Sequence, residues 1–290
     1  MTNSNSRKVI PDNQCIVLLD TNVARELGFG ASPPAWVDTF AEMAKSGYSF
    51  SLADATVAEL LNQYTDGRIN TQYDHAKMIS TLSKFLNPQV PVLLGKRDIM
   101  QMIGAKPLDE SWSEAEVLEL SKQAWDFLAA AKPDTPFDHA MLQEERDDWK
   151  KIFQSLEESW EEMGSPSDLD ELAHPQLDLA LEKMDHGEGV SPSMSIRNDL
   201  QTRLLWRQFV RSKLAMEPYD PTSAKKKNDG IDFDFYRYLA LPALVVSSDK
   251  GFFGSLATID SFQKAWFHKP DELAEAWKNG ARPLPQWPGA

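Results

Sequence analysis

The sequence has few of the residues that build zinc centres and disulfide frameworks. Cys15 is its only cysteine, and its five histidines show no His-x-x-x-His spacing. A disulfide within the chain is therefore excluded, and a zinc site is disfavoured because protein-bound zinc is held mainly by cysteine and histidine. A bound metal would need oxygen ligands, which favours Mg²⁺ or Mn²⁺.

Long hydrophobic runs are also missing. No stretch approaches the roughly 18 consecutive apolar residues of a membrane-spanning helix, and residues 1–8 lack the apolar segment of a signal peptide. We therefore expect a cytoplasmic protein with no membrane partner. The 290 residues, of which 42% are hydrophobic and 10% aromatic, have the composition of a globular protein.

Basic residues are outnumbered by acidic ones, and the net charge is −14. Such a balance argues against a nucleic-acid partner, because phosphate binding needs Lys and Arg. The acids are concentrated, however: Asp109 to Glu188 holds 23 Asp and Glu against six Lys and Arg, a charge of −17, which leaves +3 for the rest of the chain. The pattern indicates a near-neutral body that carries one acidic insertion.

The apolar pattern of this body predicts an α/β fold with a central parallel sheet. Short strands are expected at residues 15–19, 48–52 and 243–246, and residues 91–94 fit either a third short strand or a connector. Helices are expected between and after these strands, over residues 36–44, from 55 onward, and over 70–85, 233–239 and 270–278. The alternation of strands and helices is typical of a parallel sheet covered by helices.

The middle of the chain predicts helices. Ser113 and Glu116 fit a capping box at the start of a helix that ends near residue 131. Further helices are expected over 138–163, 168–184 and 199–215, and the second carries an aromatic stripe that predicts packing: Trp149, Phe153, Leu156 and Trp160.

These segments predict a domain organisation. Residues 13–87 and 225–268 form the two parts of the core, and residues 88–224 form a helical insertion with an acidic part, 109–188, and a basic helix, 197–215. Residues 269–290 form a last helix and a Pro-rich tail, which is expected to be ordered only if something packs against it.

Several acids lie where a parallel sheet binds ligands, beyond the carboxyl ends of its strands. Asp20 ends the first strand, Glu59 lies one turn into the helix after the second, and Asp249 follows the last. A further acidic cluster, residues 228–232, opens the helix that leads into the last strand. Converging acids would repel one another unless a cation lay between them. Singly, each acid also fits a helix cap, a turn or a solvated helix face.

Four segments in this order carry a resemblance to a known family. Residues 16–22 (IVLLDTN) and 55–60 (ATVAEL) are similar to the first two motifs of PIN domains, which are metal-dependent nucleases, and residues 228–232 (NDGID) and 245–250 (VVSSDK) are similar to the third and fourth. Ser247 stands where Thr is usual. The resemblance covers about residues 13–87 and 225–260, and the segment between them is far longer than in compact PIN domains.

The resemblance implies a PIN-like three-layer α/β/α fold interrupted by the acidic helical insertion. It also implies hydrolysis of phosphodiester bonds, mostly in RNA, by carboxylate-bound Mg²⁺ or Mn²⁺ that activates water. The catalytic residues and metal ligands would be Asp20, Glu59, Asp232 and Asp249. Asp229, one turn from Asp232, is a fifth candidate ligand, and Asn22 and Ser247 would orient ligands or water.

Basic residues beside the third motif offer a phosphate-binding surface. Three arginines, four residues apart, share one helix face, and three lysines follow: Arg203, Arg207, Arg211, Lys225, Lys226 and Lys227. Salt bridges from these residues to the acidic insertion are the alternative interpretation.

Other functions stay open. A catalytically silent PIN-like module that binds RNA or a protein is one, and a phosphatase of the haloacid dehalogenase type is another, although Asn22 stands where that fold has a second Asp. The acidic insertion fits a mimic of nucleic acid that a partner displaces, or a solvated helical bundle. DNA remains an alternative to RNA.

Overall fold

The computed structural model describes residues 9–11, 13–66, 72–95, 99, 103, 113–138, 140–162, 191–213, 233 and 235–288. The chain divides into two compact units. The sheet unit comprises residues 1–137, 240–250 and 265–290, and the helical unit comprises residues 138–239 and 251–264. The predicted division into core and insertion stays a prediction, although the acidic segment contributes to both units.

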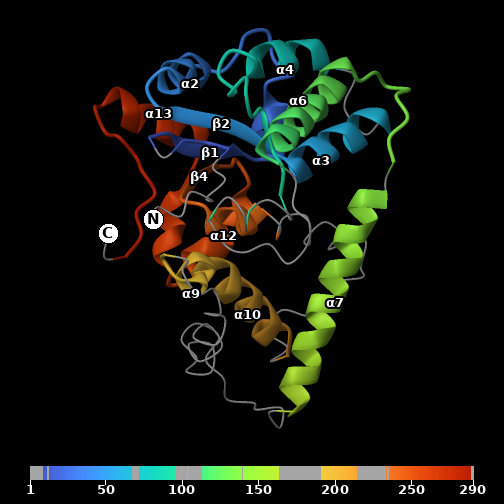
Figure 1. Cartoon of the computed structure of the whole chain (residues 1–290), viewed down its shortest axis with the longest axis vertical. Coiled ribbons are helices and arrows are strands. Elements are labelled where there is room, and N and C mark those ends of the chain that lie inside the picture. Colours follow the sequence, from blue (N-terminus) through green and yellow to red (C-terminus); the bar gives the residue numbers. More distant parts are fainter. Residues whose placement is uncertain are drawn as a thin grey trace. The chain divides into compact units, whose positions relative to one another are not determined.

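A five-stranded parallel sheet forms the centre of the sheet unit (Figure 1). Its strands lie in the order β3-β2-β1-β4-β5, and every neighbouring pair is parallel. Their bounds are β1 (Cys15–Leu19), β2 (Tyr48–Ala53), β3 (Val92–Leu93), β4 (Ala243–Val246) and β5 (Phe267–His268). The predicted α/β class with a central parallel sheet flanked by helices is confirmed. Because helices cover such a sheet, all five residues of β1 are buried, which explains their unbroken apolar run.

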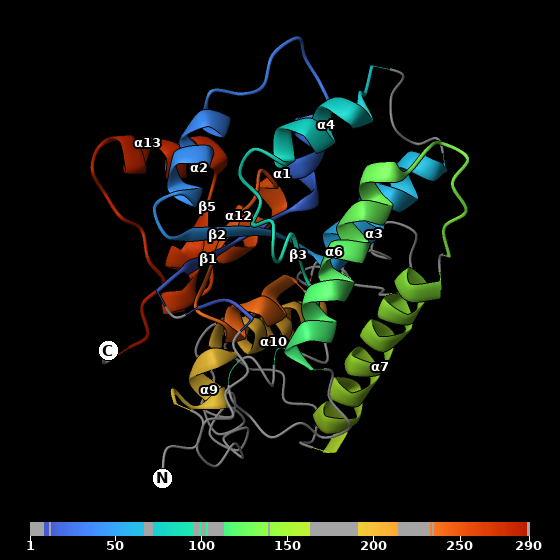
Figure 2. The same ribbon diagram turned by 45° about the horizontal axis from the view of Figure 1, so that its top comes forward.

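Helices of the sheet unit pack on this sheet and on one another. Helix α2 contacts β2 and α13, and α3 contacts β2, β3 and α6, with α1 packed between α3 and α4 (Figure 2). Their bounds are α1 (Thr21–Glu26), α2 (Trp36–Ala44), α3 (Asp54–Thr65), α4 (His75–Leu82), α6 (Glu114–Ala130) and α13 (Pro270–Lys278). Helix α6 begins with the predicted capping box.

The sequence patterns misplace some element boundaries. The helix expected over residues 70–85 begins only at His75, because the side chain of Asp74 accepts the backbone N–H of Lys77 and caps it there. Residues 92–93 are a strand, which resolves the alternative left open for 91–94. The two-residue strand β5 gives no pattern in the sequence and was not predicted. The helix expected over 168–184 lies outside the described residues.

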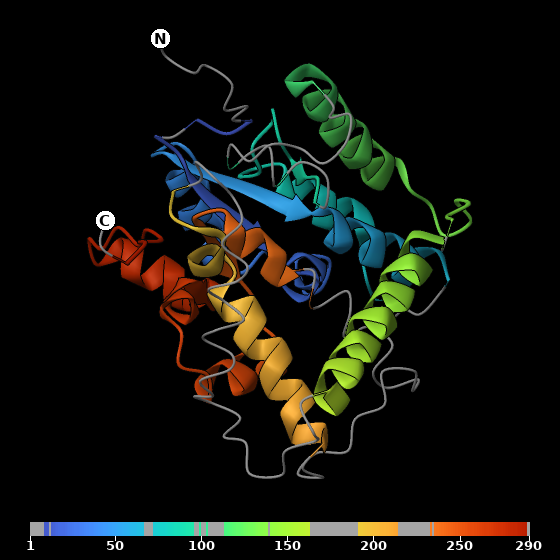
Figure 3. The ribbon, with the colours of Figure 1, turned by 60° about the horizontal axis from the view of Figure 1, so that its bottom comes forward.

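The helical unit has its own apolar core. Trp149 and Phe153 of α7 (Ala140–Glu162) pack against Phe209 and Val210 of α10 (Asp199–Lys213) and against Phe233. In Figure 3 the two helices, yellow-green and gold, converge toward their lower ends. The predicted packing role of this aromatic stripe is confirmed for its described members. The unit also contains α9 (Met194–Arg197), η1 (Tyr238–Ala240) up to Leu239 and most of α12 (Lys250–Ala257).

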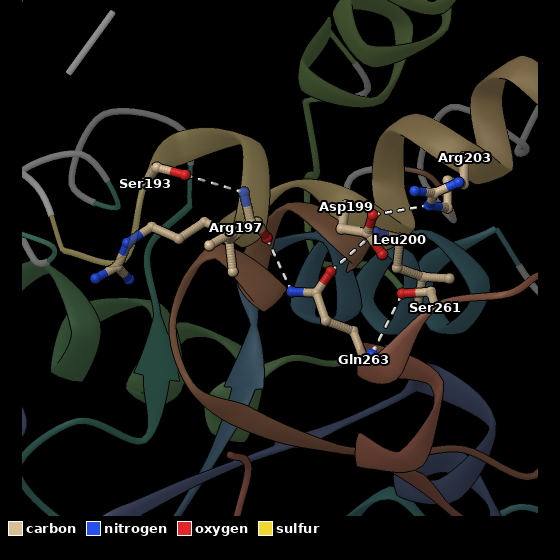
Figure 4. A network of polar contacts seen from close by, with 8 residues as sticks. Ser193, Arg197, Asp199, Leu200, Arg203, Ser261 and Gln263 are labelled. Atoms are coloured by element: carbon tan, nitrogen blue, oxygen red, sulfur yellow. Dashed lines mark hydrogen bonds and ion pairs between the residues drawn. The ribbon is translucent and has the colours of Figure 1, made fainter. Parts of the chain in front are cut away.

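A buried amide connects the segments of the helical unit (Figure 4). Gln263 is fully buried in η2 (Phe262–Trp266). Its Oε1 accepts the backbone N–H of Leu200 at 2.8 Å, and its Nε2 donates to the carbonyl oxygens of Arg197 and Leu239 at 2.9 and 3.0 Å. One side chain thus satisfies three backbone groups where α9 meets α10.

The Pro-rich tail is ordered against the sheet unit. The hydroxyl of Tyr48 donates to the carbonyl oxygen of Pro283 at 2.9 Å, and the ring of Trp287 packs edge-on against Trp266. The Arg282 guanidinium lies 3.7 Å from the ring centroid of Trp277. The tail thus has the packing partners on which its order was expected to depend. Within the described part of the chain, no helix combines the length and apolarity needed to cross a membrane.

Candidate metal centre at the carboxyl edge of the sheet

The centre of the sheet contains a topological switch point. From β1 the chain builds β2 and β3 on one side, and it later adds β4 and β5 on the other side. In open α/β sheets, the crevice beyond the carboxyl ends of the two strands at this point is the usual ligand site. Asp20 follows β1 and residues 247–249 follow β4, so two of the predicted motifs lie at this position.

Asp20 is the most buried of the described acids of the candidate site, with 6% of its surface exposed. Its backbone N–H donates to the carbonyl oxygen of Val246 at 2.9 Å, which extends the pairing of β1 with β4. Although Asp20 occupies the N-cap position of α1, its side chain makes no capping hydrogen bond. The carboxylate is therefore not used as a helix cap.

Ser247 joins the ends of β1 and β4. Its fully buried hydroxyl donates to Oδ2 of Asp20 at 2.7 Å, and its Oγ accepts the backbone N–H of Asp249 at 3.0 Å. Both groups fix the hydroxyl, so its proton points at the carboxylate. Ser247 thus has the contact expected of a residue that orients a ligand.

The environment of Asp20 raises the pKa of its carboxyl group. Burial is the largest cause, and the negative charge of Asp249 acts in the same direction. Hydrogen bonds from Ser247, from the backbone of Thr21 and from Asn22 oppose the shift. Two carboxylates near one another in a poorly hydrated position favour a bound proton or a bound cation.

Glu59 and Asn22 are placed at the same edge by contacts to α1 and β1. The hydroxyl of Thr56 donates to the carbonyl oxygen of Leu19 at 3.1 Å and so fixes the start of α3 to the end of β1. One turn later, Oε2 of Glu59 accepts the hydroxyl of Thr21 at 2.7 Å. Asn22 Nδ2 lies 3.5 Å from Oδ2 of Asp249. Thr21, which the sequence interpretation gave no role, could have been recognised from its place directly after Asp20.

The described residues do not by themselves form a complete set of metal ligands. Within the described ranges, no three of the His, Cys, Asp and Glu side chains are grouped closely enough to hold a metal ion. Asp20 and Asp249 remain a close pair of acids, and such a pair suits Mg²⁺, which proteins often bind through one or two carboxylates together with substrate phosphates. The other predicted ligands, Asp229 and Asp232, lie outside the described residues.

The predicted phosphate-binding arginines have partners within the helical unit. Arg203 Nε lies 2.7 Å from Oδ1 of Asp199, and Arg207 Nε donates to the Thr258 hydroxyl at 2.7 Å. Arg207 is only 8% exposed. Arg211 lies in the last turn of α10, and Lys225, Lys226 and Lys227 lie outside the described residues.

The acidic segment forms an ion pair with another basic residue of α10. Lys213, at the end of α10, forms a salt bridge with Glu157 of α7, which belongs to the acidic segment. Lys213 is not one of the six predicted phosphate-binding residues, so the alternative in which those six form salt bridges to the insertion also stays a prediction. Nucleic-acid binding by the basic residues, and a protein partner for the insertion, stay predictions.

Comparisons of the chain with protein-family models, with curated proteins and with solved structures found no match. Its function is therefore inferred from its own residues.

Proposed function

We propose that the chain is a Mg²⁺- or Mn²⁺-dependent nuclease that hydrolyses phosphodiester bonds of single-stranded RNA. The observation that carries the proposal is the pair of acids at the switch point, Asp20 and Asp249. The buried hydroxyl of Ser247 donates to the Asp20 carboxylate and accepts the backbone N–H of Asp249, and the charge of Asp249 acts on the pKa of Asp20. Glu59 lies at the same edge through its bond to Thr21. The order of the acidic motifs, which resembles that of PIN domains, supports the same function.

The chemistry of these residues suits metal-assisted hydrolysis. A divalent ion held by carboxylates lowers the pKa of its bound water and stabilises charge on the phosphate. Asp20 and Asp249 would bind such an ion, and Ser247 keeps the Asp20 carboxylate in one orientation. Thr21 holds Glu59 beside the site. The burial of Asp20 excludes water from its carboxylate, so a cation there is attracted more strongly than at an exposed acid.

Cleavage of a labelled single-stranded RNA with Mn²⁺ or Mg²⁺ tests this function. Asp20→Asn keeps the shape and the acceptor for Ser247 but removes the charge, so we expect metal-dependent cleavage to fall by at least about a hundredfold while the fold is retained. Glu26→Gln is the matched control, because it removes an exposed carboxylate from the same helix. Cleavage by Asp20→Asn at the wild-type rate would refute the proposal.

A catalytically silent module is the second candidate. It would use the same sheet edge and the same basic residues for binding but would hold no catalytic ion. The same assay separates the two functions, because a silent module would bind the RNA without cleaving it at any concentration of Mn²⁺.

A further inference from the structure

Arg25 lies beside the candidate metal centre and is held by two neutral side chains. On α1, its Nη2 donates to Oδ1 of Asn22 at 2.6 Å, and its Nη1 donates to Oε1 of Gln63 on α3 at 2.9 Å. The side chain is half-buried. Neither partner is a carboxylate, so these contacts fix the guanidinium without neutralising its charge.

This arrangement leaves Arg25 able to bind an anion. A guanidinium has five N–H donors in a rigid planar fork, and the two amides occupy one donor on each terminal nitrogen. The remaining N–H groups have no protein partner among the described residues. Held in one orientation, such a fork matches the oxygens of a phosphate group and loses little conformational entropy when it binds.

A chain of contacts connects Arg25 to the acid pair. Asn22 accepts from Arg25 through Oδ1 and lies against Asp249 through Nδ2. The guanidinium is thus one side chain away from a carboxylate of the candidate centre. A polyanion that approaches these acids is repelled by them, and a fixed positive charge at this distance offsets the repulsion.

We propose that Arg25 contacts a backbone phosphate of single-stranded RNA bound at the carboxyl edge of the sheet. The identity of the ligand rests on the proposed nuclease function, whereas the phosphate contact itself needs no metal and no cleavage. The sequence motifs did not single out Arg25, because its role depends on Gln63, which lies 38 residues later in the chain.

The alternative role for Arg25 is to position Asn22. Removing the guanidinium would then lower the rate of cleavage through Asn22 but leave the electrostatic part of RNA binding unchanged. The salt dependence of binding separates the two roles, since it counts the phosphates that protein charges neutralise.

The experiment measures binding of a short fluorescent single-stranded RNA in EDTA, at salt concentrations between about 50 and 200 mM. For Arg25→Gln, we expect binding about tenfold weaker at the lowest salt and a slope of log K against log salt that is shallower by about 0.7. Arg25→Met is a second variant without the charge, in case the first fails to fold. Arg25→Lys retains the charge and is expected to keep the wild-type slope.

Lys84→Gln is the control for loss of one positive charge from the sheet unit. Lys84 is exposed, and the neighbouring Leu86 pairs with Phe50 in the middle of β2 rather than at its carboxyl end. We expect this variant to keep the wild-type slope. A wild-type slope in both Arg25→Gln and Arg25→Met would overturn the proposal, and so would an equal loss of slope in Lys84→Gln.

The outcomes also separate this proposal from the nuclease function. Binding with the expected change of slope but no cleavage by the wild-type protein would refute the nuclease and leave the phosphate contact established. Cleavage by the wild-type protein, together with an unchanged slope in the variants, would refute the phosphate contact of Arg25 and leave the proposed nuclease function standing. Absence of RNA binding by the wild-type protein would overturn the contact directly.

Discussion

Replacement of Ser247 by alanine removes the hydroxyl that connects the ends of β1 and β4. That hydroxyl donates to the buried carboxylate of Asp20 at 2.7 Å and accepts from the backbone N–H of Asp249 at 3.0 Å. Ser247 is fully buried, so water does not reach its position from the surface. The variant therefore leaves a buried carboxylate and a backbone N–H without this partner.

The expected cost follows from the charge on Asp20. Hydrogen bonds to charged groups contribute about 1.5–3 kcal/mol, so we expect Ser247→Ala to lower the free energy of unfolding by about 2 kcal/mol at neutral pH. The bond stabilises the ionised carboxylate, and its loss raises the folded-state pKa of Asp20 further. A carboxyl with a raised folded-state pKa destabilises the fold above that pKa, and the penalty disappears as the pH falls toward the unfolded-state value of about 3.9. The effect of the substitution should therefore shrink toward pH 4.

Urea unfolding followed by circular dichroism, at neutral pH and near pH 4, measures both quantities. Ser83→Ala is the matched control, because its exposed hydroxyl donates to the Ile79 carbonyl oxygen of the same helix and its loss should change stability by less than about 0.5 kcal/mol. The role assigned to the hydroxyl is wrong if Ser247→Ala lowers the free energy of unfolding no more than this control does. It is also wrong if the loss of free energy is the same at both pH values.

Two further predictions concern the stability of the fold. Gln263→Leu removes the side-chain partner of three buried backbone groups, so it should lower the free energy of unfolding in urea by about 3 kcal/mol and speed hydrogen exchange at the Leu200 amide. The control Gln286→Leu changes an exposed residue and should alter neither quantity. Unchanged exchange at Leu200 would contradict this prediction. Burial lowers the pKa of His75, whose Nε2 contacts the Leu128 carbonyl oxygen, so the unfolded chain binds a proton first and stability should fall as the pH drops below about 6.5. His75→Gln should reduce that pH dependence. If the variant loses as much unfolding free energy between pH 7.5 and 5.5 as the wild-type protein does, the prediction is wrong.

The sequence predicts those features of the fold that local patterns determine. The unbroken apolar run of β1 indicates a strand buried on both faces, and Ser113 with Glu116 marks the start of α6. Both signals arise from residues close together in the chain. Strand β5 has only two residues, and its existence depends on pairing with β4, which no local pattern encodes.

Only part of the candidate site can be predicted from the sequence. Asp20 and Asp249 could be placed at one edge because parallel strands end at the same side of a sheet. The contacts that orient them, from Ser247 to Asp20 and from Asn22 to Asp249, each join residues 227 positions apart. The arginines of α10 show the limit of helix periodicity. Their spacing puts them on one face, but the bond from the buried Arg207 to the Thr258 hydroxyl depends on tertiary packing.

Mn²⁺ binding measured by isothermal titration calorimetry tests the central claim, that the acids at the switch point hold a divalent ion. The proposed site predicts that the wild-type protein and Glu26→Gln bind Mn²⁺ with equal affinity, because Glu26 is exposed on α1 and is not part of the site. Asp20→Asn and Asp249→Asn should each bind at least about tenfold more weakly, since each removes one of the two neighbouring carboxylates. Wild-type affinity in Asp20→Asn, or no binding by the wild-type protein, would contradict the claim.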